Sequence, residues 1–516
     1  MLNHHLFARA FVALAAFSLA PLASADENDV LLKVLVRKGI LSESEAAAVK
    51  SEVAKKKAKE AKTAAAKPSA AGADTGGGML SKLELSKPVE KLKLYGDIRL
   101  RYQYEDKDPQ LFLPDGTKNF DEDRSPSGSQ QSRWRFRLRL GADIQLTDHW
   151  SAGVELSTNQ ASDSANQTFE NGFDDYNIYI SKAFVRWDPS PAFTFVGGKM
   201  NNPFYHVPGL VWDPDITPTG IAEIIRFHEL LGHEEAVEGY SKDGKAFKAP
   251  APVERPWELS LIAGQFIFDD NNENNFDNDE STDSYVFETQ LLGTYKFGNG
   301  MKLTIGPGWL VESSGSVTGL QNSNPFNDSP NVSGATRNIN LLVFPGDIST
   351  KLANRPFKFF WDFSYNIEGR KRTEDIFDLV SLRNNLGQSS DDDVTDPNDF
   401  DKHHSAQDDF AYIAGFQIGE NKKAGDWSFL ADWRQVGIAS VDPNLTDSDF
   451  AAGELNTRGF HFGLNYNFTD FAIGSVTYYH AWNLRNNLIG GEATGDNAIG
   501  DSNTVRLLQV DLTIKF

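Results

Sequence analysis

Residues 503–516, NTVRLLQVDLTIKF, alternate between apolar and polar side chains through their second half. Leu508, Val510, Leu512, Ile514 and Phe516 fall on one face of an extended strand, whereas Gln509, Asp511, Thr513 and Lys515 fall on the other. The pattern predicts a β-strand with one apolar and one polar face. A half-buried strand of a soluble sheet alternates in the same way, so the rest of the chain must show what covers the apolar face.

The same alternation recurs in nearly every segment from Leu92 onward. Apolar faces are formed by Ile98, Leu100, Tyr102 and Tyr104; by Trp134, Phe136, Leu138 and Leu140; by Phe357, Phe359, Trp361, Phe363, Tyr365 and Ile367; and by Phe460, Phe462, Leu464, Tyr466 and Phe468. Faces this rich in aromatic residues would make a soluble sheet aggregate, but a strand that faces lipid requires them. The pattern therefore predicts strands with lipid on one side and water on the other.

Sixteen such segments can be placed, and an even number is what bacterial membrane barrels require. They lie near 92–105, 132–146, 149–160, 175–188, 191–200, 220–228, 256–268, 284–297, 301–312, 336–350, 355–368, 408–420, 425–437, 456–468, 471–484 and 503–516. We therefore predict an all-β fold, a transmembrane antiparallel up-and-down β-barrel of about 16 strands with a water-filled lumen. Short turns alternate with long polar loops, except that the long stretch 228–255 falls on the short-turn side. This stretch is either an excursion or an error of one strand pair.

The N-terminus carries the features of an export signal. Arg9 precedes an apolar run over residues 10–20, and the small residues Ala23, Ser24 and Ala25 follow. Residues 1–25 are therefore a predicted secretory signal peptide cleaved after Ala25. No later stretch has the run of about 18 apolar residues that a transmembrane helix needs. We expect export through the periplasm to the cell outer membrane of a Gram-negative bacterium.

A short helical segment and a linker precede the predicted barrel. Residues 26–62 read as two helices, because Gly39 ends an apolar stripe and Ser42 with Glu45 forms a capping box for a second helix. We predict a periplasmic helix-turn-helix or coiled-coil segment, either solvated or used for oligomerisation or cell-wall contact. Residues 63–90, rich in Ala, Gly and Ser at their start, predict a flexible linker, and residues 91–516 form the barrel.

Composition excludes several classes of function. The net charge of -22 argues against nucleic-acid binding, which needs clustered cationic surface. Without cysteine, the chain has no disulfide and no thiolate metal site. The acidic stretch 269–280 lacks the turn glycine and closing glutamate of a calcium-binding loop, which Asn275 and Ser281 replace. We expect no metal and no cofactor.

The loop at 201–219, NNPFYHVPGLVWDPDITPT, has an unusual composition for a solvated loop. Four prolines stiffen it, and its large apolar side chains need a place to be buried. We predict that this third external loop folds into the lumen and narrows it, since irregular backbone at membrane depth is tolerated where it lines a water-filled cavity. The alternative is a rigid surface loop. The residues assigned to the constriction are Pro203, Phe204, Trp212, Asp213, Asp215 and Thr217.

Six arginines form a row on two neighbouring predicted strands. Arg133, Arg135, Arg137 and Arg139 share one face, and Arg99 and Arg101 share the corresponding face of the strand before. Facing lipid, these side chains would be costly, so we expect them to line the lumen. Three interpretations remain open: the row relays anions, faces Asp213 and Asp215 across the pore, or pairs with acidic residues of the wall. Asp362, Asp432 and Arg434 are predicted as further lumen charges.

A resemblance to a known family rests on these motifs. Gly198-Lys199-Met200, Asn202-Pro203-Phe204, Trp212-Asp213, Asp215, Thr217-Pro218 and Gly220 resemble the signature of a putative porin family of Gram-negative outer membranes, as does the N-terminal stretch 32–45. The resemblance covers nearly the whole mature chain. It implies an oligomeric diffusion pore without an established substrate. The phosphate-selective porins, which have a similar layout and an arginine ladder, are a more distant likeness.

These observations predict a passive porin for small hydrophilic solutes and ions, with an anion- or phosphate-selective porin as the alternative. An outer-membrane barrel enzyme is the second alternative, but His461 and His480 lack a Gly-x-Ser-x-Gly elbow, so we predict no catalytic residues. Expected partners are outer-membrane lipid, lipopolysaccharide, small solutes and, through the strand that ends in Phe516, the barrel-assembly machinery. No nucleic acid is expected. A homotrimer, the solute and the sign of ion selectivity are left open.

Overall fold

The computed structural model describes residues 88–109, 129–158, 164–169, 171–173, 175–231, 239–240, 246–247, 255–269, 284–313, 339–373, 405–485 and 502–516. The chain divides into two compact units, Met1–Glu84 and Leu85–Phe516, and the barrel belongs to the second unit. The predicted signal peptide with Ala25, the helical segment 26–62 and nearly all of the linker lie outside the described residues.

Strands make up most of the described chain. They are β1 (Lys91–Pro109), β2 (Ser129–Gln145), β3 (Trp150–Thr158), β4 (Gln167–Thr168), β5 (Ile178–Ser190), β6 (Phe193–Lys199), β7 (Thr219–Arg226), β8 (Gly239–Tyr240), β9 (Ala246–Phe247), β10 (Trp257–Asp269), β11 (Ser284–Lys296), β12 (Lys302–Ile305), β13 (Gly308–Ser313), β14 (Asn340–Val343), β15 (Gly346–Leu352), β16 (Arg355–Asn366), β17 (Phe410–Gly419), β18 (Trp427–Val436), β19 (Thr457–Asn467), β20 (Ala472–Asn483) and β21 (Ser502–Lys515). Short helices are η2 (Asn171–Phe173), α4 (Phe227–Leu230) and η4 (Ala451–Gly453). Among the described residues, no helix is long and apolar enough to cross a bilayer.

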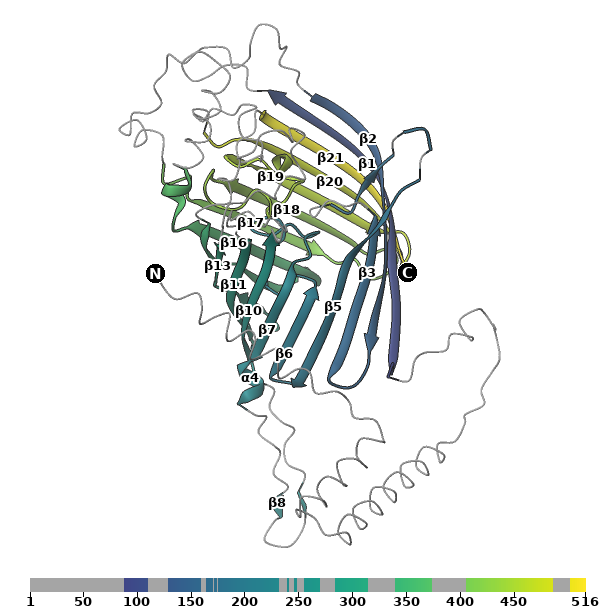
Figure 1. The fold of residues 1–516 in the computed structure, drawn as a ribbon, viewed down its shortest axis with the longest axis vertical. Helices are drawn as coiled ribbons and strands as arrows, with labels where there is room; N and C mark the ends of the chain where they lie inside the picture. The colour runs from purple at the N-terminus through teal and green to yellow at the C-terminus, as the bar shows by residue number, and fades with distance from the viewer. Residues whose placement is uncertain are drawn as a thin grey trace, which may run out of the picture. The chain divides into compact units, whose positions relative to one another are not determined.

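The strands close into a barrel (Figure 1). Each strand of the wall pairs antiparallel with the next, and β1 pairs with β21 to complete the circle. Two strands are interrupted at Pro307 and Pro345, which lack the N–H that a ladder needs, so β12 with β13 and β14 with β15 each act as one strand. Counted in this way and without β4, the described wall has 16 strands, which confirms the predicted all-β, antiparallel barrel of about 16 strands.

Two details settle questions that the sequence left open. Strand β7 pairs directly with β10, from Arg226 opposite Ser260 to Gly220 opposite Phe266. The long connection between them, with α4 and the β8–β9 hairpin, is therefore an excursion on the short-turn side, and the strand count is unaffected. At the other junction, Phe516 donates its backbone N–H to the Gly96 carbonyl at 3.0 Å and accepts from the Gly96 N–H at 2.9 Å.

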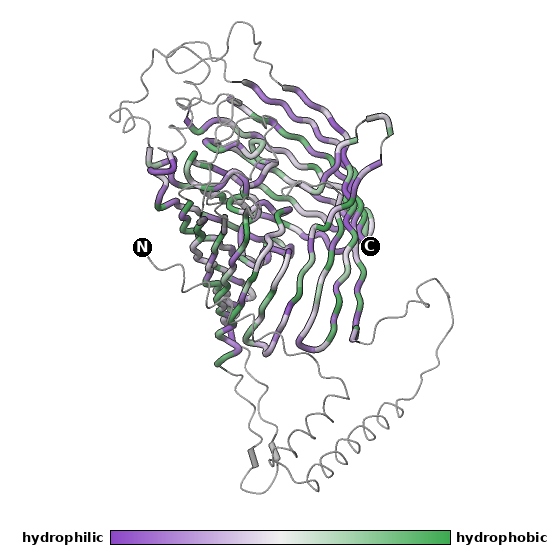
Figure 2. Tube along the Cα trace, in the orientation of Figure 1, coloured by the Kyte–Doolittle hydropathy of each residue, from purple (hydrophilic) through white to green (hydrophobic). Residues whose placement is uncertain are grey.

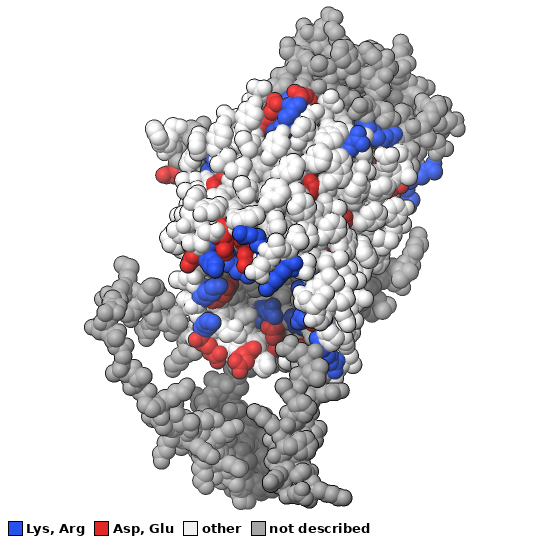
Figure 3. Space-filling model, turned by 180° about the vertical axis from the view of Figure 1, so that it is seen from behind, with Lys and Arg blue, Asp and Glu red and all other residues white. Residues whose placement is uncertain are grey.

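The two faces of the wall differ as the alternation predicts (Figure 2). Large apolar side chains project outward, and Trp134, Phe468 and Phe516 are each at least 60% exposed. Aromatic residues gather in two belts, one near the short turns (Trp150, Trp187, Phe468, Phe471, Phe516) and one near the long loops (Trp134, Phe287, Trp309, Tyr365, Phe460). Figure 3 shows an outer face with a broad area that carries few charges. An apolar band between aromatic belts is what a bilayer requires.

Candidate pore constriction

The connection between β6 and β7, residues 200–218, lies inside the barrel; we call it the inward loop. Leu210, Val211 and Trp212 are at most 4% exposed. The Trp212 ring contacts the Phe266 ring of β10 edge-on, with 6.2 Å between ring centroids. The Phe204 ring also contacts the Phe266 ring, again with 6.2 Å between ring centroids. The apolar residues that stood out in the sequence thus form a core within the lumen, against the inner face of the wall.

Hydrogen bonds fix the inward loop to strands on the far side of its core. Trp212 donates its indole N–H to Glu288 Oε2 at 2.9 Å. The backbone of Tyr205 exchanges two hydrogen bonds with the Gln290 side chain, both 2.8 Å long. The Tyr205 hydroxyl donates to Asp347 Oδ2 at 2.5 Å. Two wall strands, β11 and β15, therefore hold the loop in one position.

His206 adds an ionic anchor at the same place. Its Nε2 lies 2.9 Å from Glu288 Oε1, and its Nδ1 lies 3.9 Å from Asp362 Oδ2. Burial by itself lowers the pKa of the imidazole, but the Glu288 carboxylate and then Asp362 outweigh it and raise the pKa to about 10. The loop is thus held by a histidine that is charged at neutral pH.

This anchor predicts a pH dependence of loop closure. Because the pKa of His206 in the anchored loop exceeds its ordinary value of 6.5, the stabilisation is fully present below that value and is lost as pH rises through about 10. Single-channel conductance should be constant near neutrality and rise above about pH 10. The His206→Gln variant should show no such step, and a step of equal size in that variant would assign the effect to another group.

A second connection also enters the barrel, and the sequence analysis missed it. Residues 437–456, between β18 and β19, form what we call the strap. Ile438, Val441, Leu445 and Phe450 of the strap are at most 4% exposed. The signal was the same as in the inward loop, since large apolar residues recur in an otherwise polar connection. In residues 437–456 the sequence suggested no known motif, so it did not lead to a prediction that they enter the barrel.

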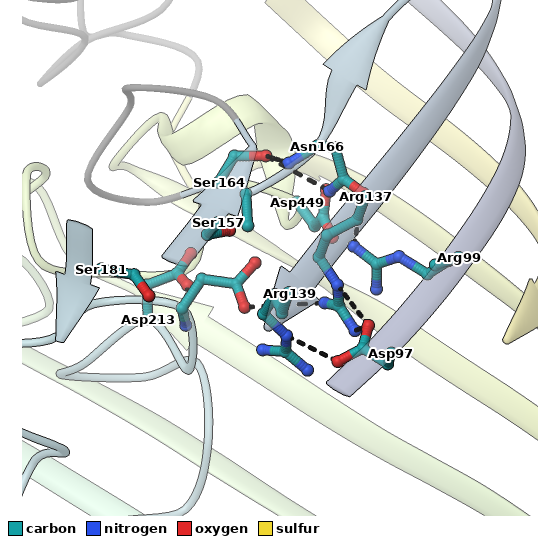
Figure 4. Close-up of polar contacts among 12 residues, drawn as sticks. Asp97, Arg99, Arg137, Arg139, Ser157, Ser164, Asn166, Ser181, Asp213 and Asp449 are labelled. Atoms are coloured by element: carbon teal, nitrogen blue, oxygen red, sulfur yellow. Dashed lines mark hydrogen bonds and ion pairs between the residues drawn. The ribbon is translucent and has the colours of Figure 1, made fainter. Parts of the chain in front are cut away.

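Three of the six arginines are paired with carboxylates of the wall. Asp97 accepts from Arg137 at 2.8 and 3.0 Å and from Arg139 at 2.7 Å (Figure 4). Arg101 makes a two-pronged pair with Asp511 of β21, at 2.8 and 2.9 Å. A fourth, Arg133, lies within ion-pair distance of Glu105 of β1, so the interpretation that the row pairs with acidic residues of the wall describes four of the six arginines.

The other three arginines have different surroundings. Arg99 donates to the Asn166 side chain at 2.5 Å, and Arg135 donates to the Asn166 carbonyl at 3.1 Å. Arg133 lies 3.9 Å from Glu105, at the long-loop end. A polar segment between β3 and β5 thus covers part of the row. The Asn166 groups that contact Arg99 and Arg135 are neutral, so they do not offset the positive charge of the arginines.

The acidic edge of the inward loop faces the row. Asp215 Oδ1 lies 4.0 Å from Arg137 Nη1. Two cavities, of about 350 and 340 Å³, share Asp213, Pro214 and Asp215 as lining residues. Burial, together with the charge of Asp447, raises the pKa of Asp213. The loop edge at 213–215 therefore borders both cavities and comes within ion-pair distance of the arginine row.

The remaining predicted residues take less direct positions. Thr217 donates its hydroxyl to the Ser181 carbonyl at 2.8 Å, which fixes the end of the inward loop to β5. Pro203 is half-buried at the start of the loop. Asp362 and Asp432 both lie on the lumen face and are almost fully buried.

His461 is held as a wall residue in the described part of the chain. Its Nδ1 lies 2.7 Å from Asp432 Oδ2, and its ring stacks on Tyr479 with 4.3 Å between centroids. Among the described residues, its hydrogen bond and its ring contact are thus with Asp432 and Tyr479, and neither is with a serine. The same residues contain no group of three His, Asp or Glu side chains placed to hold a metal ion.

A search of curated proteins found no match. Among solved structures, OmpF of Salmonella typhi in complex with daunomycin is 12% identical, with a TM-score of 0.39, and the alignment covers 84% of this chain and 100% of that one. OprB of Pseudomonas putida is 9% identical, with a TM-score of 0.43 and coverage of 82% and 94%.

The family comparison is more extensive. Residues 81–336 and 361–516 match the family described as "Putative porin". The matched residues include the whole inward loop and both strands that close the barrel. Since the match extends over most of the sequence, the chain belongs to this porin family.

Proposed function

We propose that this protein is an outer-membrane porin through which small hydrophilic solutes and ions diffuse passively. The observation that carries the proposal is the inward loop, which narrows a closed barrel and presents Asp213 and Asp215 toward the arginine row. Fixed charges of opposite sign on two sides of a narrow passage select solutes by size and by charge. The proposed mechanism involves no covalent step, and among the described residues the barrel-enzyme alternative has no serine hydrogen-bonded to His461 to support it.

The balance of charge around the passage supports weak ion selectivity. Six arginines face Asp97, Glu105 and Asp511 of the wall and Asp215 and Asp449 of the two loops. The two cavities are also lined by the acids Asp213, whose pKa is raised, Glu155, Asp432 and Asp447, and by the cations Lys182, Lys358 and Arg434. We therefore expect a slight preference for anions at neutral pH.

Planar-bilayer recording of the refolded mature protein tests the function. We expect stepwise conductance and, under a potassium chloride gradient, a reversal potential that indicates an anion preference of less than about threefold, the effect of one charge about 6 Å away in water. A protein that folds and inserts but gives no current steps would refute the porin proposal. Strong cation preference would refute the role of the arginine row.

Substitutions on the two sides of the passage should move the reversal potential in opposite directions. Arg139→Gln removes a positive charge from the wall and should lower the anion preference by about threefold, whereas Asp215→Asn should raise it by a similar factor. Asp470→Asn, at the exposed turn between β19 and β20, makes the same charge change away from the passage and serves as the control. Equal shifts in all three variants would show that the passage charges do not set selectivity.

A second candidate is an anion-selective porin, and Arg99 is the observation that favours it. Among the described residues, the hydrogen-bond partner of its guanidinium is the neutral Asn166 side chain and not a carboxylate. This candidate predicts that inorganic phosphate reduces chloride conductance and that Arg99→Gln abolishes the reduction. If phosphate has no effect on chloride conductance, the general diffusion pore stands.

The environment of the barrel follows from its surface and its family. Family membership and the apolar outer face indicate a Gram-negative outer membrane. We further propose export through the periplasm by the signal peptide, assembly by the barrel-assembly machinery through β21, contact with lipopolysaccharide at the long loops, and association into homotrimers. Migration of unheated samples on detergent gels, with and without cross-linking, measures the last of these.

A further inference from the structure

The strap follows β18 in the chain and crosses the lumen. Its first residues are hydrogen-bonded to strand β16. Asn366 donates its side-chain amide to the Ala439 carbonyl at 2.7 Å, and Ser364 donates to the Ser440 carbonyl at 3.1 Å. Both donors are at most 1% exposed. The first part of the strap is thus fixed to the inner surface of the wall by hydrogen bonds that water cannot easily replace.

The middle of the strap lies on the inward loop. The backbone N–H of Asp213 donates to the Leu445 carbonyl at 2.5 Å. Thr446 donates its hydroxyl to the Leu210 carbonyl at 2.8 Å, and the Ser448 N–H donates to Asp213 Oδ2 at 3.1 Å. Irregular backbone on both loops is therefore satisfied by the other loop, as structure at membrane depth requires.

The far part of the strap reaches the wall beside the arginine row. Asp449 accepts from the Gln509 side chain of β21 at 2.8 Å and lies 3.6 Å from Arg101 Nη1. Its side chain is 33% exposed and lines the larger of the two cavities. A carboxylate of the strap thus stands within reach of solutes, next to the residues that face the inward loop.

Arg434 of β18 connects the wall, the strap and the inward loop. Its guanidinium donates to Asp432 Oδ1 at 3.1 Å, to Asp447 Oδ2 of the strap at 2.6 Å and to the Gly209 carbonyl of the inward loop at 3.2 Å. The Phe450 ring covers it, with 5.1 Å to the ring centroid. Gly209 has a φ of +93°, and a Cβ there would lie 2.6 Å from Arg434 Nη1, so the loop approaches as closely as a residue without a side chain allows.

We infer that the strap is the second element of the constriction, locked onto the inward loop by Arg434, and that its Asp449 helps to set ion selectivity. A buried guanidinium whose partners leave is strongly unfavourable, so the strap and the inward loop keep their positions together. Arg434 is a positioning residue, since its side chain is only 3% exposed and its hydrogen-bond partners are groups of the wall, the strap and the inward loop. The inference rests on the proposed porin function.

Arg434→Met is the first test, and Arg186→Met is its matched control. Arg186 pairs with Asp188 near a short turn and has no contact with either loop among the described interactions. For Arg434→Met we expect a folded barrel whose single-channel conductance rises about twofold as the passage widens, together with a changed reversal potential. Arg434→Lys, which keeps the charge, should lie between this variant and the wild type. Arg186→Met should conduct like the wild type.

Asp449→Asn is the second test, and it remains informative if Arg434→Met does not fold. It should raise the anion preference by about threefold, while Asp470→Asn leaves it unchanged. Heat-modifiable migration on detergent gels shows that each barrel is folded. If the wild type conducts and both Arg434→Met and Asp449→Asn behave like it, this inference is wrong although the porin function holds. If the wild type gives no channels, the porin function itself fails.

Discussion

Replacing Trp212 by Ala should release the inward loop and produce a large rise in single-channel conductance. The indole is almost fully buried, packs on Phe266 and donates to Glu288 at 2.9 Å. Its loss should cost about 3–5 kcal/mol of the free energy that keeps the loop in the lumen, as for other buried tryptophans. The Glu288 carboxylate also loses a donor in a place that water does not reach.

Two other tryptophan variants make this prediction specific. Trp212→Phe keeps an aromatic ring and removes the donor, so its conductance should lie between the wild type and Trp212→Ala. Trp134→Ala makes the same change on the outer face, where the side chain is 61% exposed, and should leave the pore unchanged. Partitioning of polyethylene glycols of graded size into the open channel reports the width. A folded Trp212→Ala barrel of normal width would show that the indole does not hold the loop.

Replacing Asp97 by Asn should destabilise the barrel and make it markedly anion-selective. One carboxylate serves both Arg137 and Arg139, with contacts of 2.7 to 3.0 Å, and it is only 8% exposed. Removing its charge leaves two guanidinium groups without their carboxylate, which should cost about 3–5 kcal/mol of stability. The same change raises the anion preference of the passage by about threefold or more.

Thermal unfolding in detergent and the reversal potential measure the two effects of Asp97→Asn. Asp143→Asn is the control, because Asp143 is an exposed carboxylate on the lumen face of β2, the strand that also carries Arg137 and Arg139. We expect its melting temperature to match the wild type. An Asp97→Asn barrel as stable as Asp143→Asn would show that the arginines find other partners when the carboxylate is absent.

The strands and their faces could be predicted from the sequence because lipid and water constrain every residue of such a wall. Each outward position has to be apolar, so alternation appears in each segment without reference to its neighbours. Arg99 and Arg137 could be predicted on the lumen side for the same physical reason. The inward loop could be predicted as well, because Trp212 and Leu210 had no other place to be buried.

Partners across the barrel could not be predicted, because they depend on register and closure. Arg101 and Asp511 are 410 residues apart and meet only when β1 pairs with β21. Asp97 shares its face with the arginine row, yet its position opposite Arg139 follows from the pairing of β1 with β2. The strap was missed for a related reason: its binding site on the inward loop exists only after both loops have folded into the lumen.

The hydrogen-bond ladder of the wall is interrupted where two neighbouring strands each contain a proline. Pro307 and Pro345 lie in adjacent strands, and neither can donate a ladder hydrogen bond. Gln290 of β11 links this part of the wall to the inward loop, because its amide donates both to the Gly306 carbonyl at 3.1 Å and to the Tyr205 carbonyl of the inward loop at 2.8 Å. The inward loop is therefore hydrogen-bonded to the wall beside the interrupted strands, and the two can be expected to exchange their amide hydrogens together.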